Sequence, residues 1–112
     1  MQSVLDLEVL NELVEIMGDD MAMLLNSYFS DSQNKLDQLA KMDWQTEQET
    51  IFRMAHALKG SSRNLGIVGF SDMCESIESQ ARANNLSQND FDLSALNQHF
   101  KAACAELRER YL

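Results

Sequence analysis

The sequence contains no proline and only four glycines among its 112 residues. Because proline ends helices and glycine is common in tight turns, their scarcity favours long helices over a β-sandwich with many turns. No run approaches the roughly 18 apolar residues that a membrane-spanning helix needs. The first residues also lack the basic and apolar segments of a secretory signal. We therefore expect a cytoplasmic protein without a membrane segment.

Basic residues are also few, since nine lysines and arginines stand against 18 aspartates and glutamates, a formal net charge of −9. Surfaces that bind DNA or RNA are basic, so this balance argues against a nucleic-acid-binding protein. The sequence is 45% hydrophobic, which is enough for a real core and argues against wholesale disorder. The length suits a single domain over residues 1–112.

Only two cysteines are present, Cys74 and Cys104, and their spacing of thirty residues matches no zinc or redox motif. Each falls in an apolar row at helical spacing, so we expect buried free thiols and no disulfide. Neither His56 nor His99 has a second metal ligand four residues away, so we expect no metal site. His99 has no lysine and glycine beside it, and we interpret it as an ordinary surface or edge histidine.

Apolar residues recur every three or four positions along the whole chain, which is the helical period. The pattern predicts a short first helix, a longer second helix, a third from Trp44 to Leu65, a fourth through Phe70 and Ala81, and a last helix ending near Tyr111. Short connections between amphipathic helices favour antiparallel neighbours. We therefore predict an all-α fold: an up-and-down antiparallel four-helix bundle with the short N-terminal helix capping one end.

Several helix boundaries can be predicted from capping residues. The first helix is expected to follow Asp6 and to end at Gly18, with an inward row made of Val9, Leu10, Leu13, Val14 and Met17. Asp19 or Asp20 is expected to cap the second helix, Asp43 the third and Asp92 the last. Residues 66–69 are predicted to form a turn, and residues 84–90 a polar loop.

The third predicted helix contains an anomaly on its polar face. A helical wheel places its core stripe at Ile51, Met54, Ala55, Leu58, Ser62 and Leu65. The opposite, water-facing side holds Glu49, Arg53, His56, Gly60 and Arg63, with Lys59 on the flank. A glycine inside an exposed helix costs about 1 kcal/mol relative to alanine, so stability alone does not explain Gly60.

Gly60 lies one turn after His56 on the same face, where its lack of a side chain leaves a flat approach to the imidazole. Lys59 is expected to be a mobile cation at the edge of this approach. A neutral imidazole is a good nucleophile toward phosphorus, and a nearby cation stabilises the charge of a transferring phosphoryl group. The hydroxyl of Ser61 is a further polar group on this side, whereas Ser62 is expected to pack in the core.

Residues 55–66, with the sequence AHALKGSSRNLG, closely resemble the signature of the histidine-containing phosphotransfer (Hpt) domain family. Residues 73–78 (MCESIE) resemble a second helix of that family, and residues 18–20 resemble its N-terminal region. The resemblance implies a four-helix bundle in which His56 is phosphorylated on Nε2, Lys59 stabilises the phosphoryl group and Gly60 leaves room for the partner. Residues 67–69 depart from the turn often seen in the family.

The resemblance implies a phosphorelay intermediate, in which His56 accepts a phosphoryl group from a receiver-domain aspartate and passes it to another receiver. The partners would be receiver domains of response regulators or hybrid histidine kinases. The sequence has no glycine-rich phosphate loop, so we expect no ATP-dependent kinase activity and no cofactor. Met1 and the compact length favour a free-standing protein over a piece of a hybrid kinase.

Two other functions remain open from the sequence. The alternative is a helical interaction module that sequesters a receiver or kinase domain without carrying phosphate. A histidine-kinase-like dimerisation unit fits less well, because four or five helices can close one core within this chain and we expect a monomer.

The surroundings of His56 are expected to form a docking surface. Phe52 would supply an apolar rim, with Ser61 as a polar contact. Arg53 and Arg63 are either solvated charges, paired with Glu49 or Asp43, or part of the docking surface. Because a receiver site is acidic, we predict that acid is depleted here, that Arg53, Lys59 and Arg63 form a basic island, and that the excess acid lies on the other helices.

Overall fold

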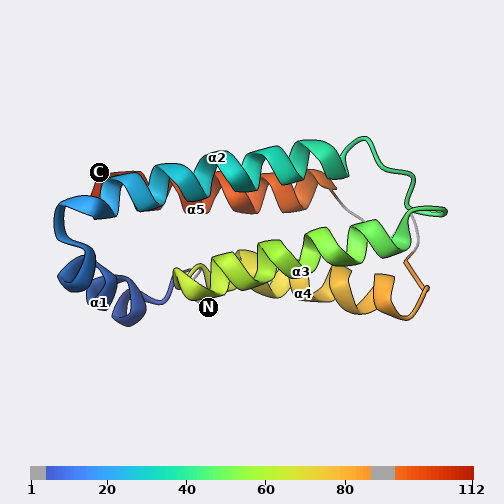
Figure 1. The fold of residues 1–112 in the computed structure, drawn as a ribbon, viewed down its shortest axis with the longest axis horizontal. Coiled ribbons are helices and arrows are strands. Elements are labelled where there is room, and N and C mark those ends of the chain that lie inside the picture. The colour runs from blue at the N-terminus through green and yellow to red at the C-terminus, as the bar shows by residue number, and fades with distance from the viewer. Residues whose placement is uncertain (1–4, 87–92) are drawn as a thin grey trace.

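The computed structural model describes residues 5–86 and 93–112, and these residues form helices and no strands (Figure 1). The elements are α1 (Leu7–Met17), a short 3₁₀ turn (Gly18–Asp20), α2 (Met21–Leu39), α3 (Gln48–Asn64), α4 (Val68–Arg82) and α5 (Leu93–Tyr111). The all-α prediction is confirmed. Within the described ranges, no helix has the length and apolar character needed to cross a membrane.

Helices α2 to α5 lie along the long axis of the molecule, and α1 lies at the end where α2 begins (Figure 1). Each long helix packs against two others, in the order α2, α3, α4, α5 and back to α2, and α3 and α4 are the most closely associated pair. The predicted four-helix bundle is therefore confirmed. This cyclic order places the α3/α4 seam and the α2/α5 seam on opposite sides of the bundle.

The core lies between these four helices and is built from the predicted apolar rows. Phe70, Leu25, Leu36, Ile51 and Leu107 are among its fully buried side chains. The core also contains a hydrogen bond of 2.7 Å between the Tyr28 hydroxyl and Ser62 Oγ, which joins α2 to α3. This bond satisfies two buried hydroxyls, so Ser62 packs in the core as predicted.

Helix α1 is held against the end of α3 by main-chain contacts. The Asp6 side chain accepts a hydrogen bond from the Val9 N–H at 3.3 Å and caps the helix as predicted. The Asp6 N–H donates to the Gly66 carbonyl at 2.6 Å. Gly66 has a φ of +76°, and a Cβ there would lie 2.8 Å from the Asp6 carbonyl oxygen. Only glycine suits this position, because the conformation and the close approach both exclude a side chain.

The predicted inward row of α1 is only partly correct. Leu10 is fully buried, but Val14 is 36% exposed, and Val9, Leu13 and Met17 are half-buried. A helix across the end of a bundle meets fewer neighbours than one along its side, so fewer of its apolar residues become covered. Gly18 ends the helix with a φ of +52°, as expected for its C-terminal glycine.

The start of α3 differs from the prediction, since the helix begins at Gln48 and not at Trp44. The Asp43 side chain accepts a hydrogen bond from the Gln45 N–H at 2.8 Å, and Glu47 Oε2 accepts one from the Asp43 N–H at 2.7 Å. These bonds stabilise a turn over residues 43–47 in place of a first helical turn.

Two further boundaries need correction. The Asp20 side chain makes no capping hydrogen bond to α2, because the 3₁₀ turn continues directly into the helix. Helix α4 begins at Val68, so the predicted turn over residues 66–69 is shorter than expected. Part of the predicted polar loop, residues 87–90, and the proposed cap Asp92 lie outside the described residues.

Both cysteines are buried and free, as predicted. Burial raises the pKa of the Cys74 thiol to about 12 and that of the Cys104 thiol to about 11. Neither sulfur therefore carries the thiolate that redox or metal chemistry requires at neutral pH.

Candidate functional site

His56 lies in the middle of α3 with 61% of its side chain exposed, so the predicted outward orientation is confirmed. Its Nδ1 atom is 2.7 Å from Oε1 of Glu78 on α4. No described residue forms a hydrogen bond with the other ring nitrogen, Nε2. The ring is thus anchored at one nitrogen and open to solvent at the other.

Glu78 is buried, with only 6% of its side chain exposed, and it bridges two residues of α3. Its Oε1 contacts His56, and its Oε2 lies 2.6 Å from Nζ of Lys59. Burial by itself would raise the pKa of the Glu78 carboxyl, but the contacts with Lys59 and His56 outweigh burial and lower it. The carboxylate is therefore ionised at neutral pH.

The charge of Glu78 determines which nitrogen of a neutral His56 carries the proton. An ionised carboxylate only accepts hydrogen bonds, so Nδ1–H must be the donor in the 2.7 Å contact. In the neutral ring the lone pair then resides on Nε2, which is the exposed nitrogen. The arrangement presents a nucleophilic nitrogen to solvent in a fixed orientation.

Lys59 lies one turn after His56, as predicted, but it is not the mobile cation that the sequence suggested. Its side chain is only 18% exposed and its ammonium group is held by the buried carboxylate of Glu78. The expectation was wrong because a wheel of one helix does not show what the neighbouring helix places beside it. Lys59 instead acts as the counter-ion that allows Glu78 to remain charged while buried.

Gly60 leaves the surface beside His56 open, as the sequence predicted. A Cβ added to Gly60 would meet nothing within 4 Å. The neighbouring Ser61 is exposed and donates its hydroxyl hydrogen bond to the Ala57 carbonyl at 3.1 Å. The hydroxyl thus folds back onto its own helix.

Phe52, one turn before His56 on α3, contacts the imidazole, and Arg82 of α4 lies over the Phe52 ring. Phe52 is half-buried, and its ring stacks on His56 with 6.1 Å between centroids and an interplanar angle of 26°. The Arg82 guanidinium lies 5.0 Å from the Phe52 centroid. Arg82 was not found from the sequence, although it lies one turn after Glu78 on α4 and so shares a helix face with it.

The predicted basic island is wrong, because acid is not depleted around His56. Arg53 pairs with Glu49 at 2.8 Å, as the sequence suggested, and both side chains are exposed. Arg63 lies 3.5 Å from Glu75 of α4, and the Lys59 charge is matched by Glu78. The acidic residues of α4 pack beside α3 and neutralise its cations.

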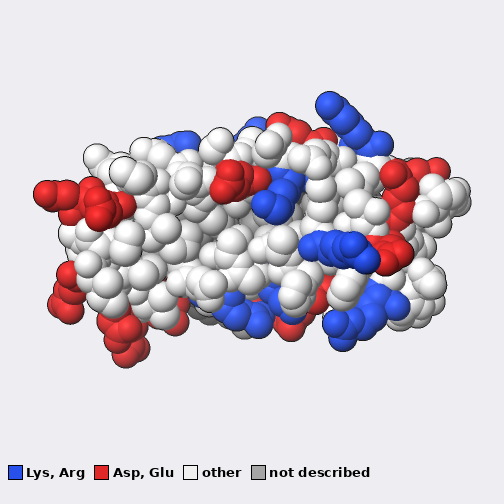
Figure 2. Space-filling view, in the orientation of Figure 1, with Lys and Arg blue, Asp and Glu red and all other residues white. Residues whose placement is uncertain are grey.

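The excess acid lies mainly elsewhere, as predicted. Residues 1–34 contain no lysine or arginine and seven acidic residues: Asp6, Glu8, Glu12, Glu15, Asp19, Asp20 and Asp31. Figure 2 shows red acidic side chains at the end of the molecule where α1 lies. His99 is half-buried on α5, in keeping with an edge position. Within residues 5–86 and 93–112, no three histidine, cysteine or acidic side chains form a group that could hold a metal ion.

Comparison with known proteins gives two matches. Residues 23–110 match the Hpt domain family. The structure resembles the crystal structure of histidine-containing phosphotransfer protein B (HptB) from Pseudomonas aeruginosa PAO1, with a TM-score of 0.86, 27% sequence identity and 100% of both chains covered. Among the curated proteins, none matches the sequence.

Proposed function

The chain belongs to the Hpt domain family, which gives it a histidine phosphotransfer role in a phosphorelay, and we propose that His56 is the residue that carries the phosphoryl group. The observation that supports this choice is the environment of its ring. Nε2 is open to solvent, and Nδ1 is bound to a buried carboxylate. His99, the other histidine, is half-buried on α5, and its Nδ1 has no hydrogen-bond partner among the residues that the structure describes.

In the proposed reaction, the lone pair of His56 Nε2 attacks the phosphorus of an aspartyl phosphate on a receiver domain. The N–P bond forms while the P–O bond to the aspartate breaks, and the carboxylate leaves with the electron pair. Nδ1 keeps its proton, so the product ring is a phosphorylated imidazolium. In the return step, a second receiver's aspartate attacks the phosphorus and the neutral imidazole leaves.

Glu78 would stabilise the positive charge that develops on the ring. Its carboxylate is already 2.7 Å from Nδ1, so no reorganisation is needed as the imidazolium forms. Lys59, held at the other oxygen of Glu78, would place its positive charge near the incoming phosphoryl oxygens. In the phosphorylated product, Glu78 would therefore stabilise the positive ring and Lys59 the negative phosphoryl oxygens.

The partner would approach over the open surface at Gly60. We propose that receiver domains of response regulators or hybrid histidine kinases dock here, with Phe52 as an apolar contact and Arg53, Ser61 and Arg63 around it. The two arginines are exposed and their partners are weakly held surface carboxylates, which a receiver can displace at little cost. The protein would act as a cytoplasmic monomer.

Transfer from a radiolabelled receiver tests this proposal. A receiver carrying a ³²P-phosphoryl group should transfer an acid-labile label to the wild-type chain and to His99→Gln, the matched control, but not to His56→Gln. Circular dichroism should show that both variants remain folded. Equal labelling of His56→Gln would contradict the assignment. Binding of the receiver without any transfer to the wild type would favour the interaction-module alternative.

A further inference from the structure

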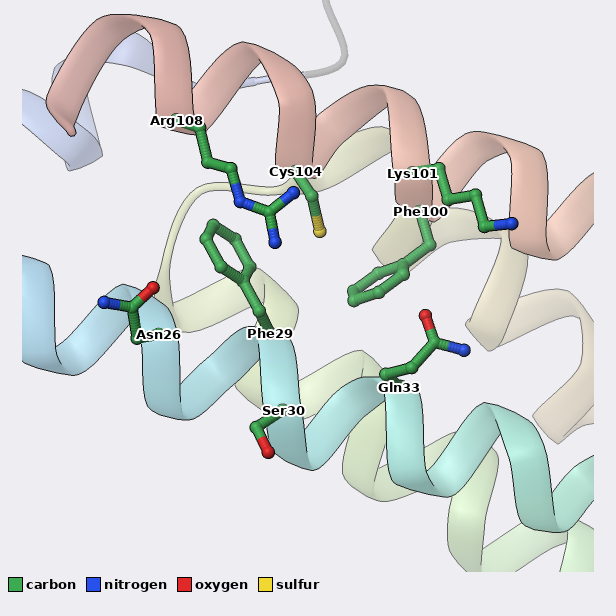
Figure 3. A pocket seen from close by; sticks show the side chains of 8 residues that line it. All are labelled: Asn26, Phe29, Ser30, Gln33, Phe100, Lys101, Cys104 and Arg108. Atoms are coloured by element: carbon green, nitrogen blue, oxygen red, sulfur yellow. The ribbon is translucent and has the colours of Figure 1, made fainter.

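A groove of about 570 Å³ lies between α2 and α5, on the side of the bundle opposite the His56 seam (Figure 3). Phe29, Phe100 and Cys104 form its apolar floor. All three are almost fully buried, so the floor is a narrow strip of core seen between the two helices. The function proposed above makes no use of this surface.

The α5 wall of the groove carries two cations, Lys101 and Arg108. The Arg108 guanidinium extends across the groove and lies 4.6 Å from the Phe29 ring centroid (Figure 3). No acidic residue lies three or four positions from either cation, the spacing that allows an ion pair along a helix. Glu106, the acid between them in the sequence, pairs with Arg110 at 2.9 Å. In the part of the chain that the structure describes, neither groove cation has a carboxylate within 4 Å.

The groove therefore carries uncompensated positive charge, although the chain has a net charge of −9. Four other cations each have a carboxylate within 4 Å, namely Arg53, Lys59, Arg63 and Arg110. The other three cations, Lys35, Lys41 and Arg82, do not line the groove. An apolar strip next to two unpaired cations is complementary to an acidic partner with an apolar side.

The dimensions of the groove suit a helix. Asn26 and Gln33 on the α2 wall are two helical turns apart, and so are Lys101 and Arg108 on the α5 wall. Seven residues of helix span about 10.5 Å, so both walls offer contacts repeated over the same length. Ridges of a third helix fit between two such helices, with apolar residues toward the floor.

We propose that this groove docks an amphipathic helix of a partner protein whose edge carries carboxylates about two turns apart. The apolar side of that helix covers Phe29 and Phe100, and its carboxylates pair with Lys101 and Arg108. Because the groove and His56 lie on opposite seams, a docked helix leaves the imidazole accessible. The proposal does not depend on phosphorylation of His56.

A synthetic peptide tests the proposal with the full chain. The probe is a fluorescein-labelled helical peptide with leucines at three- and four-residue spacing and two glutamates seven residues apart. We expect saturable binding by fluorescence anisotropy, weakened at least tenfold by Lys101→Glu/Arg108→Glu. Arg110→Glu, on the same helix but outside the groove, is the matched control and should bind as the wild type does. A peptide with lysines in place of the glutamates should regain affinity for the double variant.

Equal binding of the glutamate peptide to the wild type and the double variant would overturn the proposal, as would the absence of saturable binding up to about 1 mM. Concentration-dependent dimerisation that Arg108→Glu abolishes would also overturn it, by identifying a second copy as the occupant. His56→Gln should bind the peptide like the wild type. The outcome is therefore separate from that of the phosphotransfer experiment.

Discussion

Glu78 connects two residues of α3 through its two carboxylate oxygens, and its burial makes this connection costly to disturb. A buried carboxylate is tolerated only when its charge is compensated and its hydrogen bonds are made. From one turn of α3, His56 donates a hydrogen bond to Oε1 and Lys59 compensates the charge at Oε2. The orientation of the imidazole thus depends on a residue of another helix, 22 positions later in the chain.

Replacing Glu78 by glutamine should destabilise the protein by about 1.5–3 kcal/mol at pH 7, because partly exposed Lys59 loses its charged partner. The pKa of Glu78 is lowered in the folded state, so its stabilisation is present above the ordinary glutamate value of about 4.3 and is lost as the pH falls through the folded pKa. Urea unfolding at several pH values should show wild type and variant converging in acid.

Glu75→Gln is the control for this experiment. Glu75 is an exposed residue of the same helix whose nearest cation, Arg63, is 3.5 Å away, so its removal should change stability by less than about 0.5 kcal/mol. A constant difference between wild type and Glu78→Gln from pH 7 down to pH 3 would contradict the role of the ionised carboxylate.

The sequence identified only part of this site, for a physical reason. His56, Lys59 and Gly60 lie on one helix, and their relative positions follow from the helical period alone. Glu78 and Arg82 contact α3 residues from α4, so their positions depend on how α4 is aligned along α3. The periodicity of one helix cannot predict that alignment. For the same reason the predicted basic island around His56 is wrong: the acids that neutralise it come mostly from α4.

At the scale of the elements, the close packing of α3 on α4 sets that register. Ser71 is fully buried, and its hydroxyl donates a hydrogen bond to the main-chain carbonyl of Lys59 at 3.2 Å. A side chain this short reaches a neighbouring backbone only when two helices lie close together. Glu78 follows Ser71 by seven residues, or two turns, so the same face of α4 that anchors to Lys59 delivers the carboxylate to His56.

Alanine substitutions at Gly60, beside His56, and at Gly66, after the end of α3, should change the free energy of unfolding in opposite directions. Gly60→Ala should stabilise the protein by about 0.5–1 kcal/mol, because alanine favours the helix and its Cβ meets nothing within 4 Å. Gly66→Ala should destabilise it by more than about 1 kcal/mol, because a residue with φ of +76° would place its Cβ 2.8 Å from the Asp6 carbonyl oxygen. Equilibrium urea unfolding measures both changes.

A bulkier residue separates stability from access at the same position. Gly60→Gln should fold, yet slow phosphotransfer to His56 relative to Gly60→Ala, since its side chain would cover the approach. Loss of stability in Gly60→Ala would show that the helix surface there is not open. Unchanged transfer in Gly60→Gln would remove the steric explanation for the glycine.

The elements themselves were largely predictable, because each long helix carries an apolar row at the helical period. The predictions fail where local side-chain hydrogen bonds replace a helical turn, or where the place of a helix in the bundle leaves apolar residues exposed. Asp43 and Glu47 form a side-chain-bonded turn that delays α3 to Gln48. Val14 is exposed because α1 lies at the end of the bundle. The amphipathic pattern of α1 predicts a helix but not where that helix packs.

At the scale of the whole molecule, charge is separated along the chain. The first 34 residues hold seven acids and no cation, whereas cations of α3 are paired with carboxylates around the candidate site. Glu12 and Glu15 are exposed on α1, which has no basic residue in its last turn to oppose the helix dipole. Self-repulsion is therefore concentrated at the end of the bundle and away from His56.

Neutralising that repulsion should stabilise the protein in a salt-dependent way. Glu12→Gln/Glu15→Gln should raise the free energy of unfolding by about 0.5–1 kcal/mol at low salt, because it removes like-charge neighbours on one helix face. The gain should shrink as salt shortens the screening length from about 30 Å at 0.01 M to about 8 Å at 0.15 M. Thermal unfolding across a salt series measures the effect.

Glu49→Gln/Glu106→Gln provides a comparison with the same change in net charge. Each of these substitutions removes an ion pair, with Arg53 at 2.8 Å or Arg110 at 2.9 Å, so no gain is expected from it. An equal gain in both double variants would mean that total charge, and not its location on α1, limits stability. A gain for Glu12→Gln/Glu15→Gln that persists unchanged at high salt would show that the effect is not electrostatic.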